Sequence, residues 1–374
     1  MERYLKKYIQ KDLERKMVFL AGPRQVGKTT LAKHILELSK SNNYLNWDTD
    51  EHKKIILKKE WDRQTSLVVF DELHKFHRWK NWIKGVYDNE GNHPAILVTG
   101  SARLDIFRKH GDSLTGRYYH YRLHPLSIKE LESTLHPEEA LTLMLKMGNF
   151  PYPLLTESES EAKRWRKERM EKVIHDDLIS LESIRNLSAM ELLVDLLRER
   201  VGSPLSIKSL SEDLHVSPHT VSAWIDILER LYVIFKVKPY SKNVKIAIKK
   251  EYKIYFMDIG EVQSEALRFE NLIASHLLKY AHFKEDIEGD KYELRYLRDK
   301  EKREVDFCLV KNNVPELLLE VKLNNAVISP HLIYFKNHFF PEKKAIQVTQ
   351  KVERAKSSAG CSVIPATQFL LDLI

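Results

Sequence analysis

A single run of eight residues constrains this chain more than any other feature of its sequence. The run fits the pattern G-x-x-x-x-G-K-[ST] at every position and reads Gly22-Pro23-Arg24-Gln25-Val26-Gly27-Lys28-Thr29. The apolar run 17–21 before it predicts a buried strand, and residues 29–38 after it predict a helix. The two glycines permit backbone angles that point a row of amide groups at one phosphate, and the helix adds its positive dipole end. The sequence therefore predicts a phosphate-binding loop.

The side chains of this loop have expected roles at a bound nucleotide. Lys28 is expected to reach the β and γ phosphates of ATP, and the Thr29 hydroxyl is expected to bind Mg²⁺. Thr30 follows in the same turn of helix and belongs to the expected nucleotide site. ATP and Mg²⁺ are therefore the expected cofactors, and the expected enzymatic activity is ATP hydrolysis.

Two adjacent acids follow the apolar run 67–70, about 40 residues after the loop. Asp71 is expected to hold Mg²⁺, and Glu72 is expected to orient or deprotonate the attacking water. Alternatively, the two carboxylates only cap the next helix. Because the phosphate loop is already present, we favour the catalytic interpretation.

Further polar residues complete the expected ATPase site. Another apolar run ends at Thr99, and either Thr99 or Ser101 is expected to contact the γ phosphate or the water. A hydroxyl at this position also suits an ordinary turn. Arg117 is a candidate arginine finger, for which Arg103 and Arg108 compete. A finger that acts in trans belongs to a neighbouring copy, so a homo-oligomer is a possible assembly.

Together these motifs resemble a widespread prokaryotic AAA+ ATPase family whose members carry a C-terminal domain of unknown function. The resemblance extends along nearly the whole chain and includes 22–30, 70–72, 99–101, 114–117, 124–127, 148–151, 176–178 and 253–260. It implies an ATPase core, a winged-helix segment and a nuclease-like C-terminus, and it implies no agreed substrate.

A helix-turn-helix pattern lies in the middle of the chain. Residues 207–214 and 218–231 predict two helices joined at Ser217, which is a good N-cap, and Pro218, a good first helical residue. The apolar residues at helical spacing, expected to face the core, are Val221, Trp224, Ile225 and Leu228. The exposed face offers no arginine, asparagine or glutamine to read a base, whereas a lysine-rich stretch at 236–253 offers a basic wing. Contact with DNA and internal packing both remain open.

A second group of charged residues lies near the C-terminus. Asp306 lies in an expected strand, and Glu320 and Lys322 share one face of the next strand because side chains two apart point the same way. Glu270, in an earlier helix, can complete the group. This set resembles the PD-(D/E)xK nuclease core, with Asp306 and Glu320 as Mg²⁺ ligands, Lys322 placing the water and Glu270 assisting. The alternative is a solvated strand pair in an inactive copy.

The expected fold class is α/β: a P-loop AAA+ core with a parallel sheet, then a helical lid, a winged-helix segment and a restriction-endonuclease-like α/β domain. The expected limits of these four parts are 1–133, 134–187, 188–256 and 257–374. Within the lid, residues 157–171 predict a charged, solvated helix without a function.

Bulk composition narrows the function classes. The net charge of +8 is compatible with DNA or RNA as a partner, yet 61 basic residues are scattered among 53 acidic ones, as on an ordinary lysine-rich surface. No run approaches the roughly 20 apolar residues of a membrane span, and the first residues lack the apolar core of a signal peptide. The two cysteines suggest neither a disulfide framework nor a metal site. The expected compartment is the cytoplasm, without membrane contact. A nucleotide-dependent switch that binds protein partners is the competing function.

Overall fold

The computed structural model describes residues 1–40, 42–100, 114–156, 158–178, 186–241, 251–324, 327–351 and 355–374. They form two compact units. The N-terminal unit comprises Met1–Pro125 with Arg230–Tyr232, and the C-terminal unit comprises Leu126–Glu229 and Val233–Ile374. The first unit ends at Pro125, somewhat before the expected limit at residue 133. The three parts expected after that limit form one unit, apart from Arg230–Tyr232.

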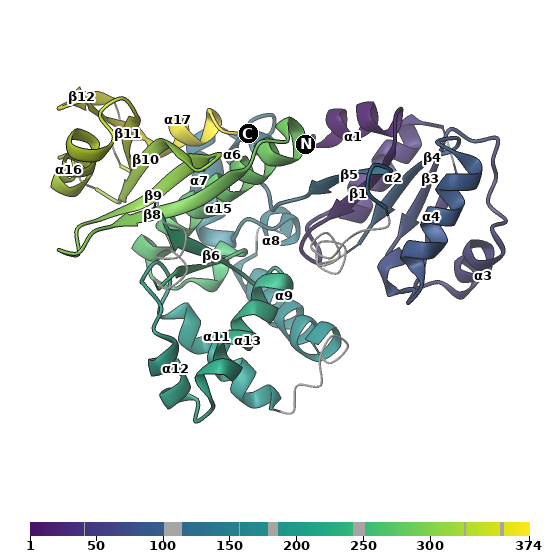
Figure 1. Ribbon diagram of the computed structural model, residues 1–374, viewed down its shortest axis with the longest axis horizontal. Helices are drawn as coiled ribbons and strands as arrows, with labels where there is room; N and C mark the ends of the chain where they lie inside the picture. The colour runs from purple at the N-terminus through teal and green to yellow at the C-terminus, as the bar shows by residue number, and fades with distance from the viewer. Residues whose placement is uncertain are drawn as a thin grey trace. The chain divides into compact units, whose positions relative to one another are not determined.

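The N-terminal unit is built on a five-stranded sheet with the order β2-β3-β4-β1-β5 (Figure 1). Every pair of neighbouring strands in this sheet is parallel. The strands are β1 Met17–Ala21, β2 Asn43–Asn46, β3 Leu67–Asp71, β4 Ala95–Thr99 and β5 Tyr118–Arg122. β1 and β3 are buried along their whole length, which explains their continuous apolar sequence. The expected α/β class with a parallel sheet is confirmed.

Helices pack on this sheet because successive residues of a strand point to opposite faces. Met17 and Phe19 of β1 share a core cluster with Ile83 and Val86. The helices of this unit are α1 Lys6–Leu13, α2 Lys28–Leu38, α3 Asp50–Lys58, the short 3₁₀ helix η1 Leu73–Lys75 and α4 Trp79–Glu90. α2 directly follows β1, so the expected phosphate loop connects the carboxyl end of a central strand to a helix start.

The C-terminal unit contains an eight-stranded mixed sheet with the order β12-β13-β11-β10-β9-β8-β6-β7. Its strands are β6 Ile234–Pro239, β7 Lys253–Phe256, β8 Tyr292–Arg298, β9 Glu304–Lys311, β10 Val314–Lys322, β11 Lys344–Thr349, β12 Lys356–Ser358 and β13 Cys361–Pro365. β6 pairs with β7 and also with β8. The hairpin expected to form the wing is therefore continuous with the sheet of the expected nuclease-like part, and the limit expected at 256/257 lies within one sheet.

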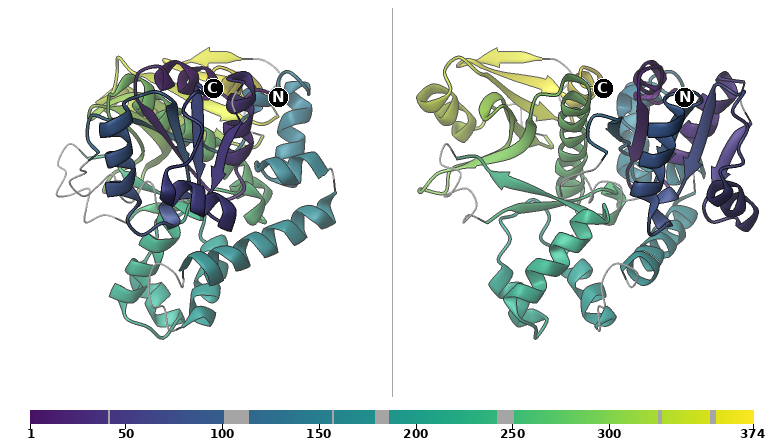
Figure 2. Two further views of the ribbon diagram at one scale, coloured as in Figure 1. Left: turned by 90° about the vertical axis from the view of Figure 1, so that its right-hand side faces the viewer. Right: turned by 45° about the vertical axis from the view of Figure 1, so that its right-hand side comes forward.

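The helices of this unit differ widely in length. They are α6 Ile128–Leu131, α7 Pro137–Met147, α8 Pro151–Thr156, α9 Glu159–Lys172, η3 Val173–Leu178, α11 Leu187–Arg198, α12 Ile207–Asp213, α13 Pro218–Arg230, η4 Ile259–Glu261, α15 Glu265–Glu288, α16 Pro330–Phe339 and α17 Ala366–Leu371. Figures 1 and 2 show α11, α12 and α13 grouped beyond the β6–β7 edge of the large sheet. None of the helices in the described ranges has the length and apolar character to cross a membrane.

Two turns that are distant in sequence pack against each other in the C-terminal unit. Gly148 has φ +93°, and a Cβ there would lie 2.5 Å from the Asp258 carboxylate. The Asn149 side chain accepts a hydrogen bond from the Ile259 amide at 3.3 Å, and the Asn149 backbone carbonyl accepts one from the Leu126 amide at 2.9 Å. A glycine is needed here because any side chain would displace the buried acid. The packing fixes the start of η4 against the 148–151 turn.

Candidate functional site: a phosphate loop and a carboxylate cluster

The loop 22–29 has the backbone shape that an anion cradle requires. Gly22, Gln25 and Gly27 all have positive φ, at +152°, +62° and +99°. A Cβ on Gly22 would lie 2.4 Å from the Leu123 carbonyl oxygen, so only glycine fits there. Gly27 is the N-cap of α2, and no side chain caps the helix. The first amide groups of α2 are therefore available to a phosphate.

Lys28 and Arg3 hold this loop from two directions. The buried Lys28 ammonium donates to the carbonyl oxygens of Gly22 at 3.0 Å and Pro23 at 2.7 Å. The Arg3 guanidinium donates to the Val26 carbonyl at 2.8 Å and to the carbonyl of His124. Lys28 therefore lies within the loop itself, and Arg3, which sequence reasoning did not identify, braces it from helix α1's side of the chain.

Three hydroxyl groups converge on the carboxylate of Asp71. Thr29 donates to Oδ2 at 2.8 Å, Tyr44 donates to the same oxygen at 2.5 Å, and Thr99 donates to Oδ1. Burial and the bond to Asp71 raise the pKa of Tyr44 well above its ordinary value, which keeps its hydroxyl a donor. The sequence predicted Thr29, Asp71 and Thr99 as one site, and the structure brings them together. Tyr44 is an addition from β2.

Glu72 follows directly and has a strained backbone, with φ +57°. Burial raises the pKa of its carboxyl group, while the nearby Lys28 and Lys75 ammonium groups act in the opposite direction. Lys75 lies 3.4 Å and the His74 ring nitrogen 3.6 Å from the carboxylate. A largely buried acid beside the loop lysine is suited to proton transfer, because its pKa is moved toward the working pH.

Among the candidate arginines and the candidate serine, Arg117 alone lies in the described part of the chain. Ser101, Arg103 and Arg108 lie outside the described residues. Arg117 immediately precedes β5, where Tyr118 pairs with Met17 at the amino end of β1. The loop follows the carboxyl end of β1, so Arg117 lies at the opposite edge of the sheet. Arg117 forms an ion pair with Asp88 at 2.6 Å. It can therefore serve as a finger only for a neighbouring copy, which remains a prediction.

In the C-terminal unit, charged groups from α15, β9 and β10 converge in a second place, here called the carboxylate site. Asp306 accepts a hydrogen bond from the Val321 amide at 2.9 Å, which places it beside Glu320. Lys322 lies 2.8 Å from Glu320. Burial and Asp306 raise the pKa of Glu320 to about 7, and likewise that of Glu270 to about 8. The four residues predicted from sequence thus share one electrostatic environment.

Residues of β7 and β9 add to the carboxylate site. The buried Lys253 ammonium lies 2.6 Å from Glu304 and 3.9 Å from Asp306. Burial by itself would lower the pKa of Lys253, but Glu270, Asp306 and Glu304 together raise it. Tyr255 donates to Glu270 at 2.7 Å. Strand alternation in the sequence put Lys253 and Tyr255 on one face, but nothing in it showed that this face meets Glu270.

The carboxylate site offers a hard cation two carboxylate ligands. Among the described residues, no three His, Cys, Asp or Glu side chains lie in a geometry that holds a metal ion. Mg²⁺ is commonly held by one or two carboxylates, with waters and substrate phosphates completing its shell. Glu320 Oε2 is buried and accepts no hydrogen bond from the described residues. Asp306 and Glu320 therefore fit Mg²⁺ as a two-carboxylate site.

The expected helix pair is present, with α12 and α13 in the predicted places. The Ser217 hydroxyl accepts a hydrogen bond from the Thr220 amide at 3.1 Å, as an N-cap does. The four apolar residues expected in the core are buried. Asp226 and Glu229 both form ion pairs with Lys236 of β6. These acids are thus compensated within the protein, and the lysines at 242, 245, 249 and 250 lie outside the described residues.

Three sequence models of protein families match consecutive parts of the chain. One is described as "AAA domain" and matches residues 14–132. The other two are described as domains of unknown function, DUF8612 at residues 138–270 and DUF4143 at residues 267–369. Together with the phosphate loop and the parallel sheet, the first match supports a nucleotide-binding ATPase of the AAA type in the N-terminal unit.

Relatives of the whole chain are uncharacterized proteins. One from Haemophilus influenzae is 22% identical over 99% of this chain and 98% of its own length. Two from Methanocaldococcus jannaschii are each 23% identical, over 86% and 95% of this chain and 79% and 81% of theirs. The chain also aligns with Thermotoga maritima RuvB (17% identity, TM-score 0.32, 62% of this chain and 88% of that one). For AMPPCP-bound DnaA from Aquifex aeolicus the values are 15%, 0.28, 60% and 86%.

Proposed function

We propose that the N-terminal unit binds ATP with Mg²⁺ and hydrolyses it. The observation that carries the proposal is the convergence of Lys28, Thr29, Asp71 and Glu72 at one edge of the parallel sheet. Lys28 and the amides of the loop would bind the phosphates, and the Thr29 hydroxyl with Asp71 would hold the metal. All of these groups are oxygen donors or fixed positive charges, the set that a magnesium nucleotide needs.

Glu72 and Tyr44 have separate tasks in this proposal. Glu72 accepts a proton from the attacking water, and its raised pKa favours that acceptance near neutral pH. Bound Mg²⁺ would neutralise charge on the phosphates. Tyr44 holds the Asp71 carboxylate in place through the same oxygen that Thr29 contacts. Tyr44 is thus a positioning residue.

Two substitutions test binding and hydrolysis separately. Lys28→Ala should weaken ATP binding at least tenfold, because the ammonium that reaches the phosphates is lost, and calorimetry measures the Kd. Glu72→Gln should leave binding within about threefold and reduce the hydrolysis rate by roughly 100-fold or more. Lys58→Ala, which removes an exposed lysine of α3, is the matched control. ATP binding that is unchanged by Lys28→Ala would overturn the proposal.

A second function is favoured by the carboxylate site of the C-terminal unit. We propose that Asp306 and Glu320 hold a divalent cation there, that Lys322 places a water for attack on a phosphodiester, and that Glu270 assists. The supporting observation is that these groups are gathered around the buried Glu320 carboxylate, which Lys322 contacts through one oxygen. Buried acids with raised pKa values and lysine partners are typical of functional sites. ATP hydrolysis would then drive or gate an action on nucleic acid.

Cleavage assays separate this function from its competitor. Single- and double-stranded DNA and RNA are incubated with Mg²⁺ or Mn²⁺ and either wild-type protein, Glu320→Gln or Lys322→Ala. We expect metal-dependent cleavage that both substitutions abolish. Glu316→Gln makes the same chemical change at an exposed position of the same strand and should cleave normally. If no cleavage occurs, or if Glu320→Gln cleaves as well as wild type, a nucleotide-dependent switch with an inactive C-terminal unit is favoured instead.

A further inference from the structure

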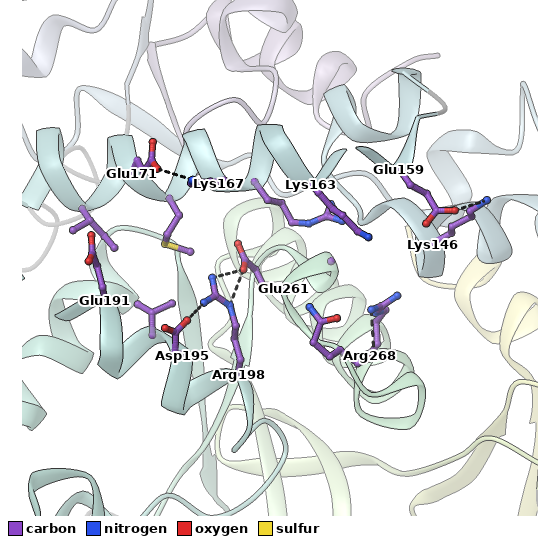
Figure 3. A pocket seen from close by; sticks show the side chains of 16 residues that line it. Lys146, Glu159, Lys163, Lys167, Glu171, Glu191, Asp195, Arg198, Glu261 and Arg268 are labelled. Carbon is purple, nitrogen blue, oxygen red and sulfur yellow. Dashed lines mark hydrogen bonds and ion pairs between the residues drawn. The ribbon is translucent and has the colours of Figure 1, made fainter. Parts of the chain in front are cut away.

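A hollow of about 750 Å³ lies within the C-terminal unit and contains none of the residues of the two sites above. Its walls are α9, α11 and the segment from Gly260 to Arg268, as Figure 3 shows. Pockets of this volume accept small organic ligands. The hollow is called the charged hollow below, because most of its lining side chains are ionised.

The acids of the charged hollow are already paired. Each has a basic side chain within 4.0 Å: Glu159 has Lys146, Glu171 has Lys167, Glu191 has the His175 ring, and both Asp195 and Glu261 have Arg198. Figure 3 shows Arg198 between Asp195 and Glu261 on the wall formed by α11. The negative charges of the lining are therefore engaged within the protein.

Three cations of the charged hollow are not paired in this way. In the parts of the chain that the structure describes, Lys163, Arg166 and Arg268 have no carboxylate within 4.0 Å. The two guanidinium groups are held instead by carbonyl oxygens: Arg166 donates to residue 147 at 3.1 Å, and Arg268 donates to residues 145 and 262 at 2.8 and 2.6 Å. Arg268 also donates to the carbonyl of residue 263 at 3.4 Å. Carbonyl groups fix the position of an arginine without forming an ion pair, and some of its five donors stay available.

The two arginines lie close enough to influence each other. Burial lowers the pKa of Arg268 and the neighbouring Arg166 lowers it further, while Asp258 and Glu265 act in the opposite direction. Arg166 also lies directly over Gly260, where a Cβ would be only 2.7 Å from the guanidinium carbon. Two like charges that are held together in a part-buried place repel each other, and an anion between them relieves the repulsion. This end of the charged hollow is therefore suited to phosphate.

The other end of the charged hollow has a different chemistry. α9 and the turn after it contribute Met170 and Ile174, and α11 contributes Val194; all three are buried apolar side chains. Glu191 and Asp195 lie beside them on α11. The distance along α9 from Lys163 to Met170 is roughly 10 Å at the helical rise per residue. A ligand that fills the hollow thus needs an anionic group at one end and an apolar group with hydrogen-bond donors at the other.

We propose that the charged hollow binds a mononucleotide, with its phosphate at Lys163, Arg166 and Arg268 and its base against Met170, Ile174 and Val194. Acids near the base accept hydrogen bonds from its amino group. This site is separate from the phosphate loop and makes the chain a two-site nucleotide protein, in which a second nucleotide contacts the C-terminal unit.

The test uses the full chain carrying Lys28→Ala, which weakens binding at the phosphate loop. Binding of AMP, GMP, inorganic pyrophosphate and a 12-nucleotide DNA strand is measured by calorimetry. At least one mononucleotide should bind. Adding Lys163→Glu should weaken this binding at least tenfold, because it reverses a charge that contacts the phosphate. Lys163 is exposed, so the substitution should leave the fold intact. Lys208→Glu, the same charge reversal at an exposed position of α12, should leave the Kd unchanged.

Other outcomes overturn the proposal. Absence of mononucleotide binding, or binding that is equal with and without Lys163→Glu, removes the site. Pyrophosphate binding as tight as the best nucleotide shows that the apolar end takes no base. Binding of the DNA strand alone shows a nucleic-acid surface instead of a small-ligand site. Because every arm lacks Lys28, these results do not depend on the proposed ATPase.

Discussion

The phosphate-loop site and the carboxylate site stabilise buried carboxylates in opposite ways. Beside the loop, the central acid Asp71 is surrounded by three hydroxyl donors. In the carboxylate site, several acids and two lysines are crowded together, and the pKa values of Glu270 and Glu320 rise to about 8 and 7. Hydrogen bonds to a carboxylate stabilise its charged form, whereas crowded buried carboxylates are stabilised by protonation or by a bound cation.

The two sites also differ in how they are specified along the chain. The loop depends on the backbone shape of eight consecutive residues, and only its acids come from elsewhere. The carboxylate site is assembled from β7, α15, β9 and β10, which are far apart in sequence. We therefore expect changes of backbone conformation to disrupt the loop most, and changes of side-chain charge to disrupt the carboxylate site most.

The largest expected effect concerns the backbone of the loop. Gly22→Ala places a Cβ about 2.4 Å from the Leu123 carbonyl at a φ that alanine disfavours, so the loop must distort. We expect ATP binding to fall at least tenfold and stability to fall by about 3 kcal/mol. Gly85→Ala in α4, where the new methyl group meets nothing, should instead be neutral or stabilise by up to about 1 kcal/mol. Calorimetry and urea unfolding measure both; equal behaviour of the two variants contradicts the comparison.

A buried histidine in the C-terminal unit extends the comparison to a titratable side chain that burial keeps neutral. His276 accepts a hydrogen bond from the Ile128 amide at 3.2 Å, and its other ring nitrogen lies 2.9 Å from the Leu272 carbonyl. Burial lowers its pKa to about 4.

The sign of the pH effect of His276 follows from that depressed pKa. The unfolded chain takes up the proton below its ordinary pKa of about 6.5, and the folded protein does so only near 4. Stability should therefore fall as pH drops from about 6.5 to about 4, by at most about 3 kcal/mol from this group. His276→Gln, which can donate and accept without titrating, should flatten that part of the profile. Urea unfolding at several pH values measures it, and an unchanged slope would count against this assignment.

The smallest expected effects have opposite signs in the two sites. Asp71→Asn removes the charge that three hydroxyl groups stabilise and should lower stability by about 1–2 kcal/mol. Glu270→Gln removes a charge from a crowded buried group and keeps the acceptor for Tyr255, so it should raise stability by about 1 kcal/mol at pH 8.5. Hydrogen exchange, measured with EDTA to remove divalent cations, shows in which of the two units each substitution changes stability. Stabilisation by both substitutions, or by neither, would break the comparison.

The elements that were predicted best are those whose sequences carry their own period and punctuation. β1, β3 and the start of α13 at Pro218 lie where the sequence pattern placed them. The charged segment 157–171 was less well predicted. It forms α9, but Trp165 and Arg169 on it are buried, and the Arg169 guanidinium lies 4.3 Å from the Phe150 ring centre. The expectation of a merely solvated helix was wrong, because a long cation can be buried over an aromatic ring.

The candidate sites show the same limit. Tyr44 reaches Asp71 only because β2 lies next to β3 in the parallel sheet, and no short pattern in the sequence states that order. Lys253 and Glu304 meet because β7 and β9 belong to the same large sheet, although the sequence suggested a domain limit between them. The position of Arg117 relative to the loop likewise depends on strand register.

By itself the sequence determined the phosphate loop, its lysine and hydroxyl, and the acids at the end of the following apolar strand. These features are local, since the backbone angles of glycine and the alternation of a strand act over a few residues. Only the tertiary structure decided which distant side chains share an environment: Tyr44 with Asp71, Lys253 with Glu304, and Arg166 with Arg268. Burial and electrostatic interaction depend on distance in space, and the order and register of strands set those distances.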